Sequence, residues 1–135
     1  MLQPKRTKHR KFQKGSIGGK VSNTLSLSFG KFGIKSLVAG RLSSQMIEAA
    51  RRSMTRKFKR NGQIWIRVFP DIGVSEKPAE VRMGKGKGNP SFWVCRVKIG
   101  QILFEFEGIS LELAKQAAFL AAQKIPLRTQ FVLID

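Results

Sequence analysis

Residues 82–90, Arg-Met-Gly-Lys-Gly-Lys-Gly-Asn-Pro, combine the two properties that a phosphate-binding loop needs. The glycines allow positive φ angles and a close approach of the backbone to a ligand, while Arg82, Lys85 and Lys87 supply positive charge. Nucleotides, lipid headgroups and nucleic-acid backbones all present such phosphates. We therefore expect this loop to lie against a phosphate group, with a solvated hairpin tip as the alternative.

The spacing of the loop argues against a nucleotide-binding motif. A Walker A loop continues from Gly-Lys to Ser or Thr and opens a helix, whereas Gly88 is followed by Asn89-Pro90 and a strand-like segment. The dinucleotide fingerprint needs a third glycine three residues after Gly86 and a helix behind it. This sequence has Asn89 at that position and no predicted helix after it. A phosphate-handling enzyme is therefore the weaker alternative to a binding protein.

Other residues that could carry catalysis are few and scattered. His9 is the only histidine and lies in a basic segment, so we expect neither a zinc site nor a histidine-assisted nucleophile. Cys95 falls in a predicted strand, where a free cysteine is usually a small buried hydrophobe. Glu105 and Glu107 share one strand face, which we interpret as an ordinary solvent-facing pattern in preference to a paired-carboxylate site. We predict no catalytic residue, no metal and no cofactor.

The charge of the chain points to a polyanionic partner. In 135 residues, 26 basic side chains face 8 acidic ones, which gives a net charge of +18 and a pI near 11.3. Residues 1–60 carry +15 of that charge and residues 61–135 only +3. The first half is therefore predicted to bind and the second mostly to fold. No apolar run approaches the ~18 residues of a membrane span, so we expect no membrane partner.

Residues 1–22 are predicted to be a basic extension, and residues 23–135 a single domain. The extension contains few apolar side chains and cannot form a core of its own. We expect it to become ordered on an anionic surface, with a solvated tail as the alternative. Its candidate contacts are Lys5, Arg6, Lys8, Arg10, Lys11 and Lys14.

Alternation and turn residues predict the first strands. Leu25, Leu27 and Phe29 alternate with polar residues from Asn23 onward, which is typical of a half-buried strand. A glycine-bracketed turn at 30–33 and a second short strand over 34–39 follow.

Ser43 or Ser44 can then cap a helix that runs to about Arg60, with Glu48 in or near its first turn. Helical spacing predicts that Ile47, Ala50, Met54 and Phe58 face the core. The other faces carry Arg51, Arg52, Arg56, Lys59 and Arg60. Because Glu48 is the only acid near these five cations, we predict phosphate contacts from Arg51, Arg52 and Arg56 in preference to a merely solvated face.

The second half is predicted to supply most of the sheet. Residues 63–69 have apolar side chains on both sides and should form a central or well-covered strand, followed by an irregular or edge segment at 74–81. Residues 92–99 and 102–107 are predicted to form a hairpin with a type II′ turn at Gly100-Gln101. Trp65 and Trp93 could stack on bases, but strand positions favour core packing.

A second helix and a last strand end the predicted fold. Ser110 can cap a helix over 111–124, and residues 129–133 form the final strand. The packing side of the helix is predicted to be Leu113, Ala117, Leu120 and Ala121.

Ordered blocks of sequence connect the chain to a known family. They are residues 2–8, Phe29-Gly30 with Phe32-Gly33, Gly40-Arg41-Leu42, residues 47–52, residues 64–71, Lys77-Pro78 and residues 82–88. With these blocks the sequence closely resembles family sixteen of the large-subunit ribosomal proteins, in its bacterial and organellar type, nearly from end to end. Because the opening block belongs to the family pattern, we expect the basic extension to be retained.

The resemblance implies an α+β fold, a hammerhead-like domain with two helices on a mainly antiparallel sheet, plus the extended basic arm. It implies a structural role in the large ribosomal subunit, near the peptidyl-transferase region, with ribosomal RNA and neighbouring ribosomal proteins as partners. It also implies that the loop and the arm reach tRNA acceptor arms, through Arg82, Lys85, Lys87 and the arm cations. A free RNA-binding module is a further alternative.

Two departures refine this resemblance. Residues 16–28 match the family only loosely, so RNA contacts from that stretch are not carried over. Residues 61–65 and 77–82 are similar to organelle-encoded members, especially plant-type mitochondrial ones, which favours a mitochondrial ribosome over a chloroplast or bacterial one. Some bacterial members are modified at the arginine that matches Arg82.

Overall fold

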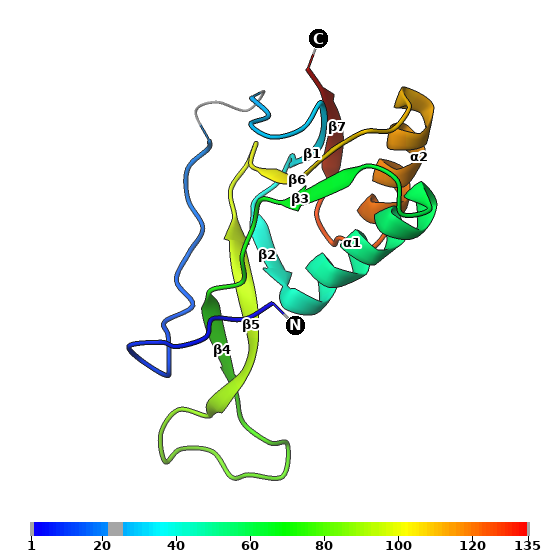
Figure 1. Ribbon diagram of the computed structural model, residues 1–135. Helices are drawn as coiled ribbons and strands as arrows, with labels where there is room; N and C mark the ends of the chain where they lie inside the picture. Colours follow the sequence, from blue (N-terminus) through cyan, green and yellow to red (C-terminus); the bar gives the residue numbers. More distant parts are fainter. Residues whose placement is uncertain (1, 22–25, 135) are drawn as a thin grey trace.

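The computed structural model describes residues 2–21 and 26–134, which form two antiparallel sheets and two helices (Figure 1). A four-stranded sheet has the order β3-β6-β1-β7, and a three-stranded sheet has the order β2-β5-β4. The elements are β1 (Phe32–Ser36), β2 (Gly40–Ser43), α1 (Ser44–Phe58), β3 (Gln63–Ile66), β4 (Ile72–Glu76), β5 (Asn89–Val97), β6 (Ile102–Glu107), α2 (Leu111–Ala122) and β7 (Thr129–Leu133). The predicted α+β class, with two helices and mainly antiparallel strands, is confirmed.

The two helices pack on each other. Helix α2 also contacts β1 and β7 of the four-stranded sheet, and α1 contacts β3 of that sheet and β2 and β5 of the three-stranded sheet, so the core lies between the helices and both sheets. Aromatic rings fill its centre, with Phe106 5.7 Å from Phe58 and 6.0 Å from Phe32 between ring centroids. Ile47, Ala50, Met54 and Phe58 are buried, as the helical spacing predicts. Burial of rings and branched chains at this interface is the main source of folding free energy.

Both helices begin at the predicted serines because a serine oxygen can accept a hydrogen bond from an otherwise unpaired amide. The Ser43 side chain accepts from the Met46 amide, and the Ser110 side chain from the Leu113 amide. Helix α1 ends at Phe58, where Lys59 takes a left-handed conformation, rather than at Arg60. Glu48 lies just beyond the first turn and therefore near it, as predicted.

The predicted packing side of α2 is confirmed at Ala117 and Ala121, with Leu113 partly buried against the core, and is wrong at Leu120. Ala114, Ala117, Ala118 and Ala121 are buried, while Leu120 is 36% exposed. Small side chains let α2 approach its neighbours closely, so the alanines and not the leucine occupy the contact. The helix also ends at Ala122, two residues before the predicted end.

The predicted hairpin of residues 92–99 and 102–107 is wrong. Strand β5 pairs with β2 and β4, whereas β6 pairs with β1 and β3, so the two strands belong to different sheets. A tight turn is present, but Gly100, with a φ of 84°, is its third residue, because the Gln101 amide donates to the Lys98 carbonyl. The Ser36 carbonyl accepts a hydrogen bond from the Gly100 amide. This contact lies where the chain passes from β5 in one sheet to β6 in the other.

Three other strand predictions need correction. Residues 26–31 form no strand although Leu27 is buried, and residues 23–25 of that predicted strand lie outside the described residues. The next strands are β1 and β2 rather than one strand over 34–39, and Gly33 lies within β1. Strand β3 ends at Ile66 and is an edge strand of the four-stranded sheet rather than a central one, although its residues 64–66 are half-buried. The edge position predicted after it is confirmed by β4.

Candidate nucleic-acid interface

The loop of residues 82–90 lies at the tip of the long β4–β5 hairpin, which projects away from the helices (Figure 1). Gly84, Lys85 and Gly86 have φ angles of 88°, 61° and 91°, so the chain turns through left-handed conformations that glycine adopts without strain. The side chains of Arg82, Lys85 and Lys87 are all exposed. The hairpin thus carries three cations to the far end of the molecule.

The N-terminal arm, residues 2–21, lies along the three-stranded sheet. Arginine side chains of the sheet hold it there by donating to its backbone carbonyls. The Arg96 guanidinium donates to the carbonyls of Gln13 and Lys14 at 3.0 and 2.5 Å. The Arg41 guanidinium donates to the Gly15 carbonyl at 2.5 Å. Because these contacts use carbonyl groups, the side chains of the arm stay free to point outward.

The arm and the loop meet at Lys87. The Lys87 ammonium donates to the Phe12 carbonyl, and the Lys11 ammonium donates to the Lys87 carbonyl at 2.9 Å. Beside this junction, the Phe12 ring packs edge-on against Trp93, with 6.2 Å between ring centroids. Six arm cations predicted to bind RNA are exposed around it: Lys5, Arg6, Lys8, Arg10, Lys11 and Lys14. Arm and loop together form one cationic surface, which we call the arm–loop surface.

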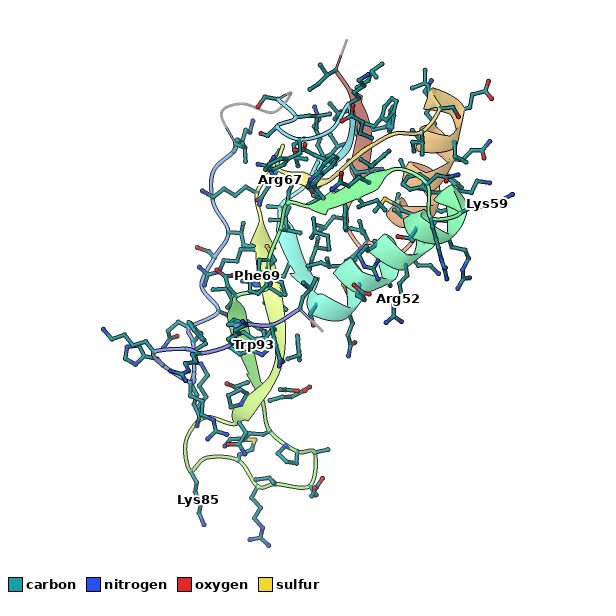
Figure 2. All side chains as sticks on the ribbon, in the orientation of Figure 1. Arg52, Lys59, Arg67, Phe69, Lys85 and Trp93 are labelled. Atoms are coloured by element: carbon teal, nitrogen blue, oxygen red, sulfur yellow. The ribbon has the colours of Figure 1, made fainter. Side chains whose placement is uncertain are left out.

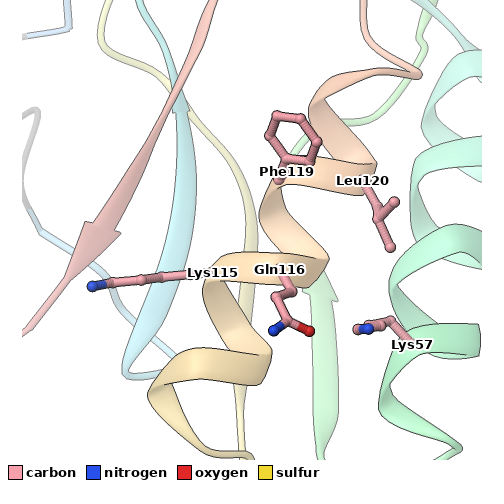
Figure 3. A pocket seen from close by; sticks show the side chains of 5 residues that line it. All are labelled: Lys57, Lys115, Gln116, Phe119 and Leu120. Carbon is pink, nitrogen blue, oxygen red and sulfur yellow. The ribbon is translucent and has the colours of Figure 1, made fainter.

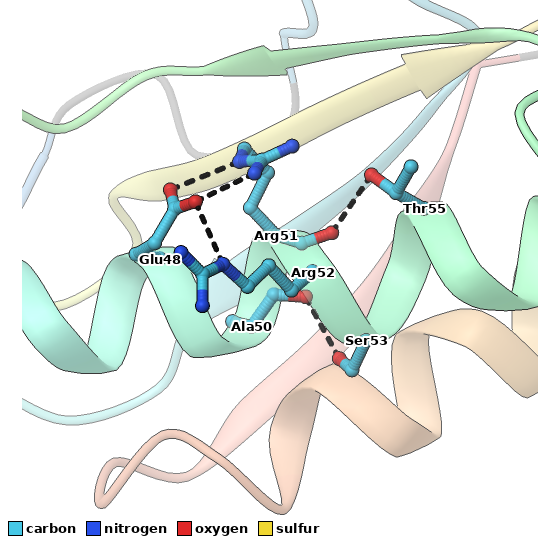
Figure 4. A network of polar contacts seen from close by, with 6 residues as sticks. All are labelled: Glu48, Ala50, Arg51, Arg52, Ser53 and Thr55. Carbon is cyan, nitrogen blue, oxygen red and sulfur yellow. Dashed lines mark hydrogen bonds and ion pairs between the residues drawn. The ribbon is translucent and has the colours of Figure 1, made fainter. Parts of the chain in front are cut away.

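The predicted cations of α1 form a separate group. Glu48 accepts from Arg51 at 2.6 and 2.9 Å and from Arg52 at 3.1 Å (Figure 4). The hydrogen bond from Arg51, with that from Arg52, lowers the pKa of Glu48 to about 2. Glu48 is therefore ionised at neutral pH and offsets part of the charge of both arginines.

The same face of α1 contains a groove of about 440 Å³. Its lining residues are Arg51, Arg52, Thr55, Arg56, Lys59 and Arg60. Figure 2 shows Arg52 and Lys59 on helix α1 and Lys85 at the tip of the β4–β5 hairpin, away from the helices. The structure thus places the twelve predicted residues on two cationic surfaces rather than one.

Glu105 was predicted to face solvent with Glu107, but its side chain is buried. Its side chain is 0% exposed and accepts hydrogen bonds from Arg67 at 2.5 Å and from the amides of Ser28, Phe29 and Gly30 at 2.6–3.2 Å. Burial alone raises the pKa of Glu105, but the three amide donors and the charge of Arg67 outweigh it and hold the pKa below its ordinary value. This residue is an ionised structural centre, and alternation along β6 could not identify it.

The two tryptophans are half-buried and lie outside the core cluster, so the predicted core packing is wrong. Trp65 stacks on Phe29, with 6.0 Å between centroids and 20° between planes. The Arg67 guanidinium lies 4.9 Å from the centre of the Phe29 ring. Cys95, by contrast, is buried as predicted, and burial raises the pKa of its thiol.

A hollow of about 450 Å³ between α1 and α2 contains none of the predicted site residues. Figure 3 shows its lining of Lys57, Lys115, Gln116, Phe119 and Leu120. Over residues 2–21 and 26–134, no group of three His, Cys, Asp or Glu side chains could hold a metal ion. No helix in the described part of the chain is long and apolar enough to cross a membrane.

Comparison with known proteins gives a consistent result. The family model of ribosomal protein L16p/L10e matches residues 4–132. Large ribosomal subunit protein uL16m of Prototheca wickerhamii is 65% identical over 133 residues, which cover 98% of both chains. Large ribosomal subunit protein uL16 of Rhodopseudomonas palustris is 54% identical and that of Gluconacetobacter diazotrophicus 57% identical, each over 98% of this chain and 96% of the relative.

Proposed function

The chain belongs to the ribosomal protein L16p/L10e family, and we propose that its arm–loop surface binds RNA near the peptidyl-transferase region and helps to position tRNA. The protein is a structural constituent of the large ribosomal subunit and not an enzyme. Its partners are large-subunit ribosomal RNA and neighbouring ribosomal proteins. The proposal includes contacts of the loop and the arm with tRNA acceptor arms.

The observation that carries the proposal is the junction of arm and loop at Lys87. Two segments whose cations were predicted independently to bind RNA are joined at one end of the molecule, where Arg82 and Lys85 project beyond the sheet. Lys11 donates to the Lys87 carbonyl, and the backbone contacts of the arm leave its other cations available for phosphates. Phosphate contacts of this kind set position, while the folded shape of the RNA supplies specificity.

The α1 face is proposed as a second contact with ribosomal RNA, through Arg51, Arg52 and Arg56. Arg56 is exposed and lines the groove, whereas Arg51 and Arg52 share Glu48. We assign Arg56 the larger share of this contact, because a cation already paired with a carboxylate contributes less to binding a phosphate. Surfaces at two ends of one small domain would let it bridge separate RNA segments.

The large ribosomal subunit is the place of action, and a mitochondrial ribosome is favoured over a bacterial one. The relative from Prototheca wickerhamii, the mitochondrial form uL16m, is 65% identical, against 54% for the bacterial relative from Rhodopseudomonas palustris. Sedimentation of the endogenous protein from fractionated mitochondria tests this. The protein should travel with large subunits and stay with them after low magnesium separates the subunits. Recovery as a free protein at the top of the gradient would favour a free RNA-binding module.

A photocrosslinking amino acid tests the tRNA contact directly. Placed at Lys85 in assembled ribosomes, it should give crosslinks to tRNA that depend on tRNA occupancy. Lys115 on α2 provides the matched control, since it is exposed but lies on the helical side of the molecule (Figures 1 and 3). Equal tRNA crosslinking from both positions, or none from position 85, would contradict the proposed role of the loop.

A further inference from the structure

A second hollow, of about 310 Å³, lies beside Trp65 where β3 begins and β6 ends. Its lining residues are Gly62, Gln63, Trp65, Glu107 and Gly108. Gln63 and Glu107 are directly opposite each other on the paired strands. The site shares no residue with the arm–loop surface or with the groove on α1.

Bare backbone forms part of this hollow. Gly62 has a φ of 70°, and a Cβ atom there would lie 2.5 Å from the Glu107 carbonyl oxygen. Gly108 has a φ of 86°, and its Cβ would lie 2.9 Å from the Gly62 Cα. The turns before β3 and after β6 therefore meet backbone to backbone, and this close contact fixes the floor of the hollow.

The aromatic wall of the hollow is fixed in place by a chain of contacts. Trp65 stacks on Phe29, and Phe29 lies against Arg67. Buried Glu105 holds both supports, since it accepts from Arg67 at 2.5 Å and from the Phe29 amide at 2.6 Å. The half-buried indole is thus oriented before any ligand arrives, which lowers the entropic cost of binding.

The polar groups of the hollow suit the edge of a base better than a phosphate. Gln63 offers an amide donor and acceptor, and Glu107 offers carboxylate acceptors. Lys31 lies 4.0 Å from Glu107 and balances its charge, but no cation lines the hollow itself. Glutamine pairs with adenine, and carboxylates accept from the amino group of cytosine. A phosphate would meet a carboxylate here and be repelled.

We infer that the hollow beside Trp65 receives one unstacked nucleobase of the large-subunit RNA, stacked on the indole and hydrogen-bonded by Gln63 and Glu107. The inference rests on the proposed function, because that function brings folded RNA to this protein. Proteins that read single-stranded RNA regularly stack splayed bases on aromatic side chains. An adenine or a cytosine, each with an exocyclic amine, fits the polar edge best.

Fluorescence of a single tryptophan provides the first test. The chain has two tryptophans, so Trp93→Phe leaves Trp65 as the only indole. Titration of this full-length variant with large-subunit RNA should quench Trp65, because a stacked base quenches indole emission. Inorganic polyphosphate, which carries charge without bases, should not. Binding is followed separately by filter retention.

The possible results separate the two proposals. RNA that binds without quenching Trp65 overturns the base site and leaves the proposed function intact. RNA that fails to bind the unaltered protein overturns the proposed function itself. A change at Trp65 that requires added ribosomal proteins rather than RNA would show that a protein fills the hollow, which also overturns the inference.

Substitutions provide the second test. Trp65→Leu should weaken RNA binding by about five- to a hundredfold, the range measured for loss of one base stack, whereas Trp65→Phe should retain most of the affinity. Gln63→Ala should weaken binding without affecting the fold, because Gln63 is exposed. The salt dependence of binding should stay unchanged in all three, since no phosphate contact is removed. Unchanged affinity in both Trp65→Leu and Gln63→Ala would refute the site.

Discussion

At the scale of single residues, the carboxylate of Glu105 connects three parts of the chain. It accepts from amides of the segment that precedes β1, from Arg67 after β3, and it is itself part of β6. A buried carboxylate is stable only when donors replace its lost hydration. Four groups donate to this carboxylate, namely three amides and the Arg67 guanidinium. The same hydrogen bonds fix the positions of Phe29 and Arg67.

Removing this carboxylate should destabilise the whole fold. Glu105→Ala leaves the Arg67 guanidinium and three amides without their acceptor, so we expect a loss of about 3–5 kcal/mol in the free energy of unfolding. Urea denaturation followed by circular dichroism measures this loss. Glu107→Ala, two residues along the same strand, is the control and should cost under about 1 kcal/mol, because its ion pair with Lys31 is exposed. Equal losses would show that the contacts of Glu105 contribute little.

The lowered pKa of Glu105 predicts a specific acid sensitivity. A carboxyl group whose pKa is lower in the folded state stabilises the protein above its unfolded pKa of about 4.3. That contribution is lost as the pH falls from about 4.3 through the folded pKa. Glu105→Gln cannot titrate, so the difference in unfolding free energy between the two proteins should shrink from pH 6 to pH 2. A constant difference would contradict the assignment.

At the scale of elements, the N-terminal arm is positioned by side chains that donate to its carbonyls. Arg41 and Arg96, opposite each other on β2 and β5, hold residues 13–15, and Lys87 holds Phe12. Two arginines side by side repel each other, and the arm carbonyls partly offset this by accepting from both. The sheet thereby orients an arm that has no core of its own.

Lys87 and Lys85 should behave differently in the absence of RNA. Lys87→Ala removes the hydrogen bond to Phe12, worth about 0.5–1.5 kcal/mol, so the arm should open more often. Limited trypsin digestion of the arm should then be about two- to tenfold faster, because cleavage follows the open population. Lys85→Ala should leave that rate unchanged, since Lys85 makes no contact with the arm in the described structure. Equal digestion rates would count against the junction.

At the scale of the whole molecule, the chain has a net charge of +18, and its arm–loop surface and the face of α1 are two cationic surfaces. Without a polyanion, these cations repel one another and reduce the stability of the compact state. Binding of RNA phosphates releases counterions, so both surfaces should contribute to the salt dependence of RNA affinity.

Measured binding to large-subunit RNA should weaken steeply with salt, and each lost phosphate contact should reduce the logarithmic slope by about 0.7–0.9. Combined Arg82→Ala and Lys85→Ala should lower the slope by roughly 1.4–1.8. Arg56→Ala should lower it more than Arg52→Ala, because Arg52 is already paired with Glu48. Lys115→Ala is the control on α2, and an affinity independent of salt would contradict the electrostatic account.

Local signals in the sequence determined the helices, the final strand and the cationic loop. A serine cap reaches an amide three residues away and helical periodicity repeats within a turn, so Ser110 and the pair Ser43 or Ser44 could be identified as caps without the fold, and the structure selects Ser43. Burial of Glu105, the junction at Lys87, the separation of β5 from β6 and the hollow beside Trp65 were decided by the tertiary structure. Their partners lie far apart, with 75 to 77 residues between Glu105 and its amide donors. No local pattern specifies which distant segment supplies a donor, since that depends on how the two sheets and helices pack.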